Sequence, residues 1–283
     1  MNLSQAAYTL SININNCHAE IWCNDVIIFE YKSVSTQKKN ISISVPLNHV
    51  ILKPCEFNIR ATITPRFRQE SFEKDSFVRL QLFVLDYLNP KKTKTKLFDL
   101  KTPESSDIPE KNTIELPSVT KGIEGLPYYE ISGIFKDKIL PFNEIGWINS
   151  VDLNEYDSKL LLMELFESYN TVYTMLVNKN AEAFLNMNAE KDNLMAVTYY
   201  LKSDEIKHHR NKIKNVIQND ELELIPFDIS NIESVIMGKG NVAKLRRKNG
   251  LPLIIFNDPK NGGTIKLDLK FHKKNATSKF SII

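Results

Sequence analysis

Hydrophobic and polar residues alternate along the first half of the chain with a period of two. From Tyr8 to Ile14 every second residue is apolar, and the alternation resumes at Ala19, Ile21 and Cys23. This pattern is typical of strands with one buried face, because successive side chains of a strand point to opposite sides. Half-apolar sheets bury their inner faces against each other, so we expect an antiparallel β-sandwich. Further strands are predicted at residues 26–29, 41–45, 57–63, 78–84 and 129–131, with Asn24-Asp25 as the turn before the first of them.

A long exposed loop is predicted near residues 89–127 of this sandwich domain, which is assigned to residues 1–150. The stretch is rich in proline, lysine and glycine and shows little periodicity beyond Leu97-Phe98. Acidic residues such as Asp99 and Glu104 follow its lysines closely. A solvated loop therefore fits this stretch better than a basic binding patch.

The hydrophobic period becomes helical at Asp152. Asp152 and Glu155 have the spacing of a capping box, which predicts a helix from about residue 154 to 177. Residues 181–187 and 190–218 are predicted to form two or three further helices. Helices followed by a strand meander are typical of an α+β domain, and this domain is assigned to residues 151–283. Its strands are predicted at residues 221–225, 233–237, 242–247, 251–257, 264–272 and 280–283.

The stretch from Leu165 to Leu185 combines spaced aromatic residues, a short Lys-Asn turn and a second helix that ends in Phe-Leu. In these features it resembles the opening of nuclear-transport-factor-2-like (SnoaL-like) domains. The resemblance implies that the helices of residues 153–283 are wrapped by a curved antiparallel sheet shaped as a cone. The family contains small-molecule isomerases and hydratases as well as non-catalytic binding modules, so the fold alone does not choose between these functions. The N-terminal half resembles no family.

Composition and charge argue against a polyanionic partner. The 283 residues are 42% hydrophobic and 25% charged, as in ordinary globular proteins. Residues 1–150 contain 18 Lys and Arg against 17 Asp and Glu, and residues 151–283 contain 19 against 17, for a net charge of +3. Proteins that bind nucleic acids or anionic membranes concentrate basic residues on one face or tail, so neither partner is expected.

The apolar stretches and cysteines indicate a cytoplasmic location. The longest apolar stretches are four residues, and no basic residue precedes an apolar run near the N-terminus, so neither a membrane span nor a secretory signal is expected. The odd number of cysteines, Cys17, Cys23 and Cys55, favours reduced thiols that pack as small hydrophobic residues. On one strand Cys17 and Cys23 would lie roughly 20 Å apart, too far to share a metal. No metal and no cofactor are expected.

Two groups of residues are candidates for binding a partner. Lys244, Arg246 and Lys248 share one face of a predicted strand, where they would either be solvated or grip an acidic partner. Trp22 and Tyr31 are candidate stacking platforms for a sugar.

The candidate catalytic residues are Asp268 and His272, which lie on one face of a predicted strand. Asp268 could orient the imidazole of His272 there.

The run from Gly238 to Ala243 matches G-x-G-x-x-A, but Gly250 and Pro252 leave no room for the helix that a dinucleotide site needs. A hairpin turn is predicted there instead.

The leading hypothesis is a non-enzymatic recognition protein that binds another protein, such as a bacterial toxin-neutralising immunity protein or a secretion-system accessory. It rests on the absence from the sequence of H-E-x-x-H, G-x-S-x-G, paired C-x-x-C and Walker motifs, on the expected cytoplasmic location, and on the large surfaces that a sandwich and a helix–sheet domain offer. The alternatives are a carbohydrate-binding sandwich that uses Trp22 and Tyr31, and a small-molecule-binding protein, lyase or isomerase with Asp268 and His272 in its pocket.

Overall fold

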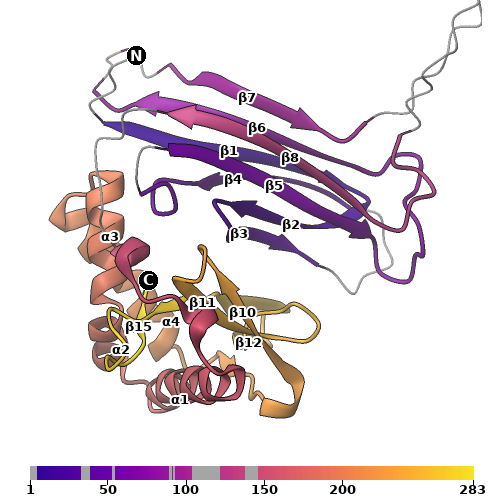
Figure 1. Ribbon diagram of the computed structural model, residues 1–283. Coiled ribbons are helices and arrows are strands. Elements are labelled where there is room, and N and C mark those ends of the chain that lie inside the picture. Colours follow the sequence, from indigo (N-terminus) through magenta and orange to yellow (C-terminus); the bar gives the residue numbers. More distant parts are fainter. Residues whose placement is uncertain are drawn as a thin grey trace, which may run out of the picture. The chain divides into compact units, whose positions relative to one another are not determined.

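The protein is a mixed α+β molecule. A computed structural model describes residues 5–32, 39–52, 55–88, 91, 93–103, 122–137 and 146–283, and Figure 1 shows their course. Within these ranges the strands form four antiparallel sheets, and the four α-helices all lie in the C-terminal half. No described helix is long and apolar enough to cross a membrane. The chain divides into two compact units, residues 1–141 and residues 142–283.

The first unit contains two four-stranded sheets, with the strand orders β4-β1-β6-β7 and β3-β2-β5-β8. The sheets contact each other at Tyr8 of β1 and Phe135 of β8, whose ring centroids are 6.4 Å apart. The strands are β1 (Ala6–Asn15), β2 (Cys17–Cys23), β3 (Val26–Tyr31), β4 (Asn40–Pro46), β5 (Cys55–Pro65), β6 (Phe77–Asp86), β7 (Thr95–Lys101) and β8 (Tyr129–Asp137).

The period-two pattern of the sequence corresponds to the buried side of these sheets. Leu10, Ile12 and Ile14 of β1 are fully buried, and the residues between them are half-buried. The predicted turn at Asn24-Asp25 is confirmed, since both residues have positive φ angles, 49° and 65°, which Asn and Asp tolerate.

Two of the three cysteines are buried free thiols, as predicted. Cys17 and Cys23 lie at opposite ends of β2, and burial raises the pKa of Cys17 to about 12. The side chain of Cys55 lies outside the described residues.

The prediction of an uninterrupted loop at residues 89–127 is wrong, because residues 95–101 form strand β7 on the edge of the first sheet. Every residue of β7 is exposed or half-buried, so the strand has no apolar alternation for the sequence to reveal. Cross-strand ion pairing favours its position, since Asp99 accepts hydrogen bonds from Arg79 of β6 at 2.7 and 2.9 Å. Residues 89–90, 92 and 104–121 of the predicted loop lie outside the described part of the chain.

The helices of the second unit are α1 (Ser158–Val177), α2 (Ala181–Met187), α3 (Ala189–Tyr199) and α4 (Ser203–Gln218). The first begins four residues later than predicted, because Asp157 rather than Asp152 is its N-cap. The Asp157 carboxylate accepts hydrogen bonds from the amides of Lys159 and Leu160 at 3.0 and 2.9 Å. Asp152 caps a separate 3₁₀ turn at Leu153–Glu155.

The strands of the second unit form one sheet in the order β10-β11-β14-β15 and another in the order β13-β12-β9. The single strand predicted at 264–272 is therefore wrong, since it is divided between both sheets. Leu165, Tyr169 and Val172 of α1 pack on the core that the strands line, and the rings of Tyr169 and Phe271 lie 5.0 Å apart. The strands are β9 (Glu223–Leu224), β10 (Ile232–Met237), β11 (Val242–Arg247), β12 (Ile254–Asp258), β13 (Gly263–Leu267), β14 (Phe271–His272) and β15 (Ser281–Ile282).

The glycine-containing run after β10 is a hairpin turn, as predicted. Gly238, Lys239 and Gly240 all have positive φ angles, and β10 pairs with β11 on either side of them.

Candidate functional site

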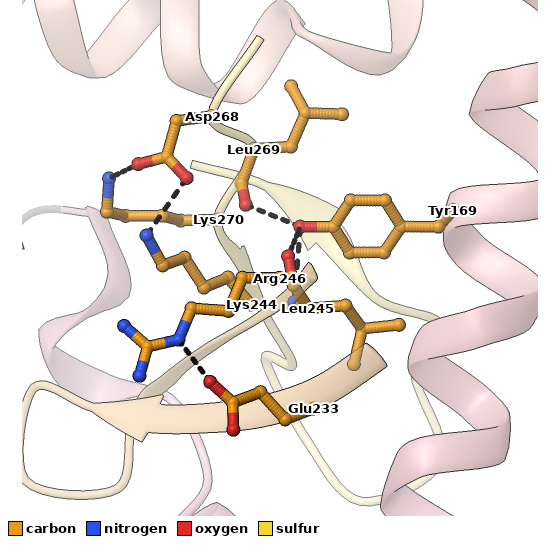
Figure 2. A network of polar contacts seen from close by, with 8 residues as sticks. All are labelled: Tyr169, Glu233, Lys244, Leu245, Arg246, Asp268, Leu269 and Lys270. Carbon is orange, nitrogen blue, oxygen red and sulfur yellow. Dashed lines mark hydrogen bonds and ion pairs between the residues drawn. The ribbon is translucent and has the colours of Figure 1, made fainter. Parts of the chain in front are cut away.

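A network of charged side chains surrounds Lys244 of β11 in the second unit, and Figure 2 shows its members. The Lys244 side chain is fully buried, and its ammonium lies 3.1 Å from Asp268 Oδ1. Lys270 contacts the other oxygen of the same carboxylate, at 2.8 Å. The Asp268 carboxylate thus pairs with two lysines. The buried charge of Lys244 needs such a partner because water does not reach it.

The two lysines keep the Asp268 carboxylate ionised. Burial by itself raises the pKa of Asp268, but the charges of Lys270 and Lys244 and their hydrogen bonds outweigh it and hold the pKa well below its usual range. Lys191 of α3 belongs to the same electrostatic environment: burial and the charge of Lys270 lower its pKa, while Asp268 and Asp192 act in the opposite direction.

The hydroxyl of Tyr169 contacts the backbone where the chain leaves the strand conformation, at residues 268–270. It donates to the carbonyl of Leu269 at 2.7 Å, and the amide of Leu245 donates to it at 3.3 Å. The Tyr169 side chain thereby satisfies the carbonyl of Leu269, which has no partner among the described strands. Burial, with the nearby charge of Asp268, raises the pKa of Tyr169 well above its usual value, which keeps the phenol protonated.

The predicted basic row at Lys244, Arg246 and Lys248 does not form a free cationic face. Lys244 is buried on Asp268, and Arg246 Nε lies 2.6 Å from Glu233 Oε1 of the neighbouring strand β10. Lys248 lies beyond the end of β11 and donates to the carbonyl of Ser230 at 2.9 Å. Strand β11 thus carries only Lys244 and Arg246 of the predicted row, and the sequence pattern does not reveal the groups that neutralise them.

His272 and Asp268 have separate partners, so the prediction that Asp268 orients His272 is wrong. Nδ1 of His272 lies 2.6 Å from the hydroxyl of Ser150, and Nε2 lies 3.0 Å from Glu190 of α3. Burial lowers the pKa of His272; Glu190 acts in the opposite direction, and Lys274 lowers it further. Asp268 precedes the break between the sheets, whereas His272 follows it, which separates the two side chains.

Ser150, His272 and Glu190 have the residue types of an activated serine nucleophile, and no motif in the sequence indicates this group. Ser150 and His272 are 122 positions apart, and only the fold brings them together. The His272 side chain is 1% exposed, so a substrate does not reach its ring in this arrangement. The group holds η1 (Gly146–Asn149), α3 and β14 to one another, and we assign it a positioning role.

Trp22 and Tyr31 lie in the first unit, and neither is a bare platform. The guanidinium of Arg60 covers the Trp22 ring, 4.7 Å from its centroid, and the ring of Tyr31 meets His18 edge-on at 6.1 Å. Both aromatic residues are half-buried.

The side chains around Trp22 form a mixed aromatic, apolar and charged surface, which we call the Trp22 face. The register places Trp22 of β2 opposite Arg60 of β5, on the side away from the buried residues of the sheet. Arg60 pairs with Glu130 at 3.4 Å, and the hydroxyl of Tyr128 donates to Glu130 at 3.1 Å. Ile134 lies further along β8 and is 60% exposed. The face therefore comprises Trp22, Arg60, Tyr128, Glu130 and Ile134.

A comparison of the chain with protein-family models, curated proteins and solved structures finds no match. Among the described residues, no cluster of three or more His, Cys, Asp or Glu side chains is arranged to hold a metal ion.

Proposed function

We propose that the protein is a non-enzymatic recognition module that binds another protein through the Trp22 face. The observation that carries the proposal is the composition of this face, where Trp22, Arg60 and Tyr128 lie on the same side of the sheet as an exposed Ile134. Tryptophan, tyrosine and arginine are the residue types that contribute most of the energy of protein interfaces. A toxin-neutralising immunity protein or a secretion-system accessory is the kind of protein in which we expect such a module.

The geometry gives less support to the two alternatives. A sugar would stack on the ring face of Trp22, and the guanidinium of Arg60 already lies there. An enzyme in the second unit would use Asp268 and His272 together, whereas each is engaged in its own ion pair. Protein recognition needs neither a bare ring nor a shared catalytic pocket.

We interpret the first unit as a β-sandwich and retain the nuclear-transport-factor-2-like cone as a proposal for the second. The contact between the two sheets at Tyr8 and Phe135 supports the sandwich. The packing of α1 on strands of the second unit supports a helix-on-sheet arrangement. The proposed partner is a protein rather than a nucleic acid or a membrane, and the proposed location is the cytoplasm.

The proposal predicts that one substitution on the Trp22 face abolishes capture of a partner. We expect Ile134→Asp to lose a protein that the wild-type chain retains, because a carboxylate introduced into an interface is desolvated without a partner. Ile229→Asp is the matched control, since Ile229 is also exposed, at 44%, and lies in the second unit.

Quantitative affinity capture with the three chains as bait, followed by mass spectrometry, measures the difference. A protein retained by the wild type and by Ile229→Asp but lost by Ile134→Asp supports the proposal. Equal retention by all three chains, or no specific partner for any of them, overturns it. Circular dichroism of each bait ensures that the comparison is made between folded chains.

A further inference from the structure

A cavity of about 400 Å³ lies between α1 and the turn that precedes β15. On the helix side, Glu164, Glu167, Ser168 and Thr171 line it, one helical turn apart. Residues 276–280 line the opposite wall. The cavity belongs to neither the Lys244 network nor the Trp22 face, and its volume lies within the range of small-ligand sites, which begins at about 300 Å³.

The hydroxyl groups of this cavity present acceptors and not donors. Ser168 and Thr171 donate their protons to the carbonyls of Glu164 and Glu167, each at 2.9 Å. On the opposite wall, Thr277 donates to the side chain of Asn275 at 2.9 Å and Ser278 to its carbonyl at 2.8 Å. A hydroxyl has one proton and two lone pairs, so each of these oxygens can only accept a further hydrogen bond.

The charges of the cavity leave one carboxylate available at its helix wall. Glu164 is paired with Lys273, whose ammonium lies 2.8 Å away and also contacts the ring of Phe280. Glu167 is exposed and forms no ion pair within the described residues. Lys279 on the opposite wall is an exposed lysine with a flexible stem. A ligand with several hydrogen-bond donors and a positive charge would therefore donate to the hydroxyl oxygens and pair with the carboxylate of Glu167.

We propose that this cavity binds an ammonium or guanidinium group carried on a short aliphatic stem. Glu167 would accept charge-assisted hydrogen bonds from the cation, and Ser168 and Thr171 would accept the remaining donors. Met187 and Phe280 supply apolar surface for the stem. The group is either a lysine or arginine side chain of a protein or a free small amine. This chemistry is opposite to the acidic partner that the Lys244 row suggested, and it does not depend on the Trp22 face.

Titration of the full chain with N-acetyl-L-arginine amide and with N-acetyl-L-citrulline amide tests the proposal, with backbone NMR shifts as the readout. The two probes have nearly the same shape, but citrulline is neutral. We expect millimolar binding of the arginine probe, with shifts at residues 164–171 and 276–280, and binding of the citrulline probe at least about tenfold weaker. Agmatine distinguishes the sources: tighter binding of agmatine indicates a free amine, and tighter binding of the arginine amide indicates a protein side chain.

Two pairs of variants identify the residues responsible. Glu167→Gln and Thr171→Val should each weaken the arginine probe, whereas Glu223→Gln, an exposed glutamate on β9, and Ile134→Asp on the Trp22 face should leave it unchanged. Thr171→Val keeps the test available if Glu167→Gln fails to fold. Absence of binding at millimolar concentration, equal binding of the citrulline probe, or shifts elsewhere on the chain overturn the proposal. Failure of the partner capture described above leaves these outcomes unaffected.

Discussion

Lys244 depends on Asp268 because its ammonium is closed to water. Removing one partner of a buried ion pair leaves the other charge uncompensated, whereas an apolar residue of similar length removes the need for compensation. We expect Asp268→Ala to lower the free energy of unfolding by about 2 kcal/mol, since Asp268 is partly exposed, and Lys244→Met to lower it by less. Urea denaturation of the two variants measures both values. A larger loss for Lys244→Met than for Asp268→Ala would contradict this description of the network.

His272 should make stability depend on pH. Burial lowers the pKa of His272 in the folded chain, and the groups that face its ring are Ser150, Glu190 and, through Glu190, Lys274. The unfolded chain, with a histidine pKa of about 6.5, therefore takes up the proton first. The contribution of neutral His272 to the free energy of unfolding is therefore complete above about pH 6.5 and is lost as the pH falls.

The variant His272→Gln should flatten the fall in the free energy of unfolding below pH 6.5, whereas His208→Gln, on the exposed side of α4, should retain the wild-type slope. Urea denaturation at a series of pH values gives the slopes. The same slope in His272→Gln as in the wild type would show that His272 does not control it.

At the scale of elements, the turn between β10 and β11 depends on glycine for its close approach to residues 152–154. A Cβ atom on Gly240 would lie 1.9 Å from the Asp152 carboxylate, and the φ angle of Gly240 is 97°. Gly262 also has a positive φ, 68°, but a Cβ there would meet nothing within 4 Å. A comparison of substitutions at Gly240 and Gly262 therefore separates the cost of backbone strain from the cost of steric crowding.

We expect Gly262→Ala to cost about 1 kcal/mol from backbone strain alone, and Gly240→Ala to cost about 2 kcal/mol more because of overpacking. Thermal unfolding of the two variants under identical conditions provides the comparison. Equal costs would mean that Asp152 and Asn154 move away without penalty.

The elements that the sequence predicted well are those with a buried face. The alternation from Tyr8 to Cys23 and the helical spacing after residue 158 both reflect core packing, which acts directly on the residue pattern. The sequence pattern does not reveal strand β7, because pairing with β6 and the ion pair between Arg79 and Asp99 position an edge strand that has no fully buried side chain. The sequence pattern does not reveal the break at 268–270, where the backbone bonds to the hydroxyl of Tyr169, 100 positions away.

The same limit applies to the candidate site. Lys244, Asp268 and His272 are the candidate residues of the second unit that the sequence indicates, and all three are charged or polar residues in buried networks. Ser150 and Glu190, the partners of His272, come from distant elements and carry no motif. The sequence does not predict the cavity beside α1, because its two walls, residues 164–171 and 276–280, are more than 100 positions apart in the chain.

At the scale of the whole molecule, near neutrality reflects charges that are compensated within each unit. Arg66 and Glu73 form a pair at 2.8 Å in the first unit, and Lys273 and Glu164 form one in the second. The charge balance of the sequence thus corresponds to ion pairs inside each unit and leaves local surfaces to decide recognition. The Trp22 face is the surface on which the proposed function rests.

Amide hydrogen exchange of the chain, alone and in complex with the partner captured by the wild type, tests the central claim most directly. If the Trp22 face is the interface, exchange slows in β2, β5 and β8, around Trp22, Arg60 and Ile134, and not in the second unit's β12 and β13. Protection confined to the second unit, or no difference between the free and the bound chain, would contradict recognition through the Trp22 face.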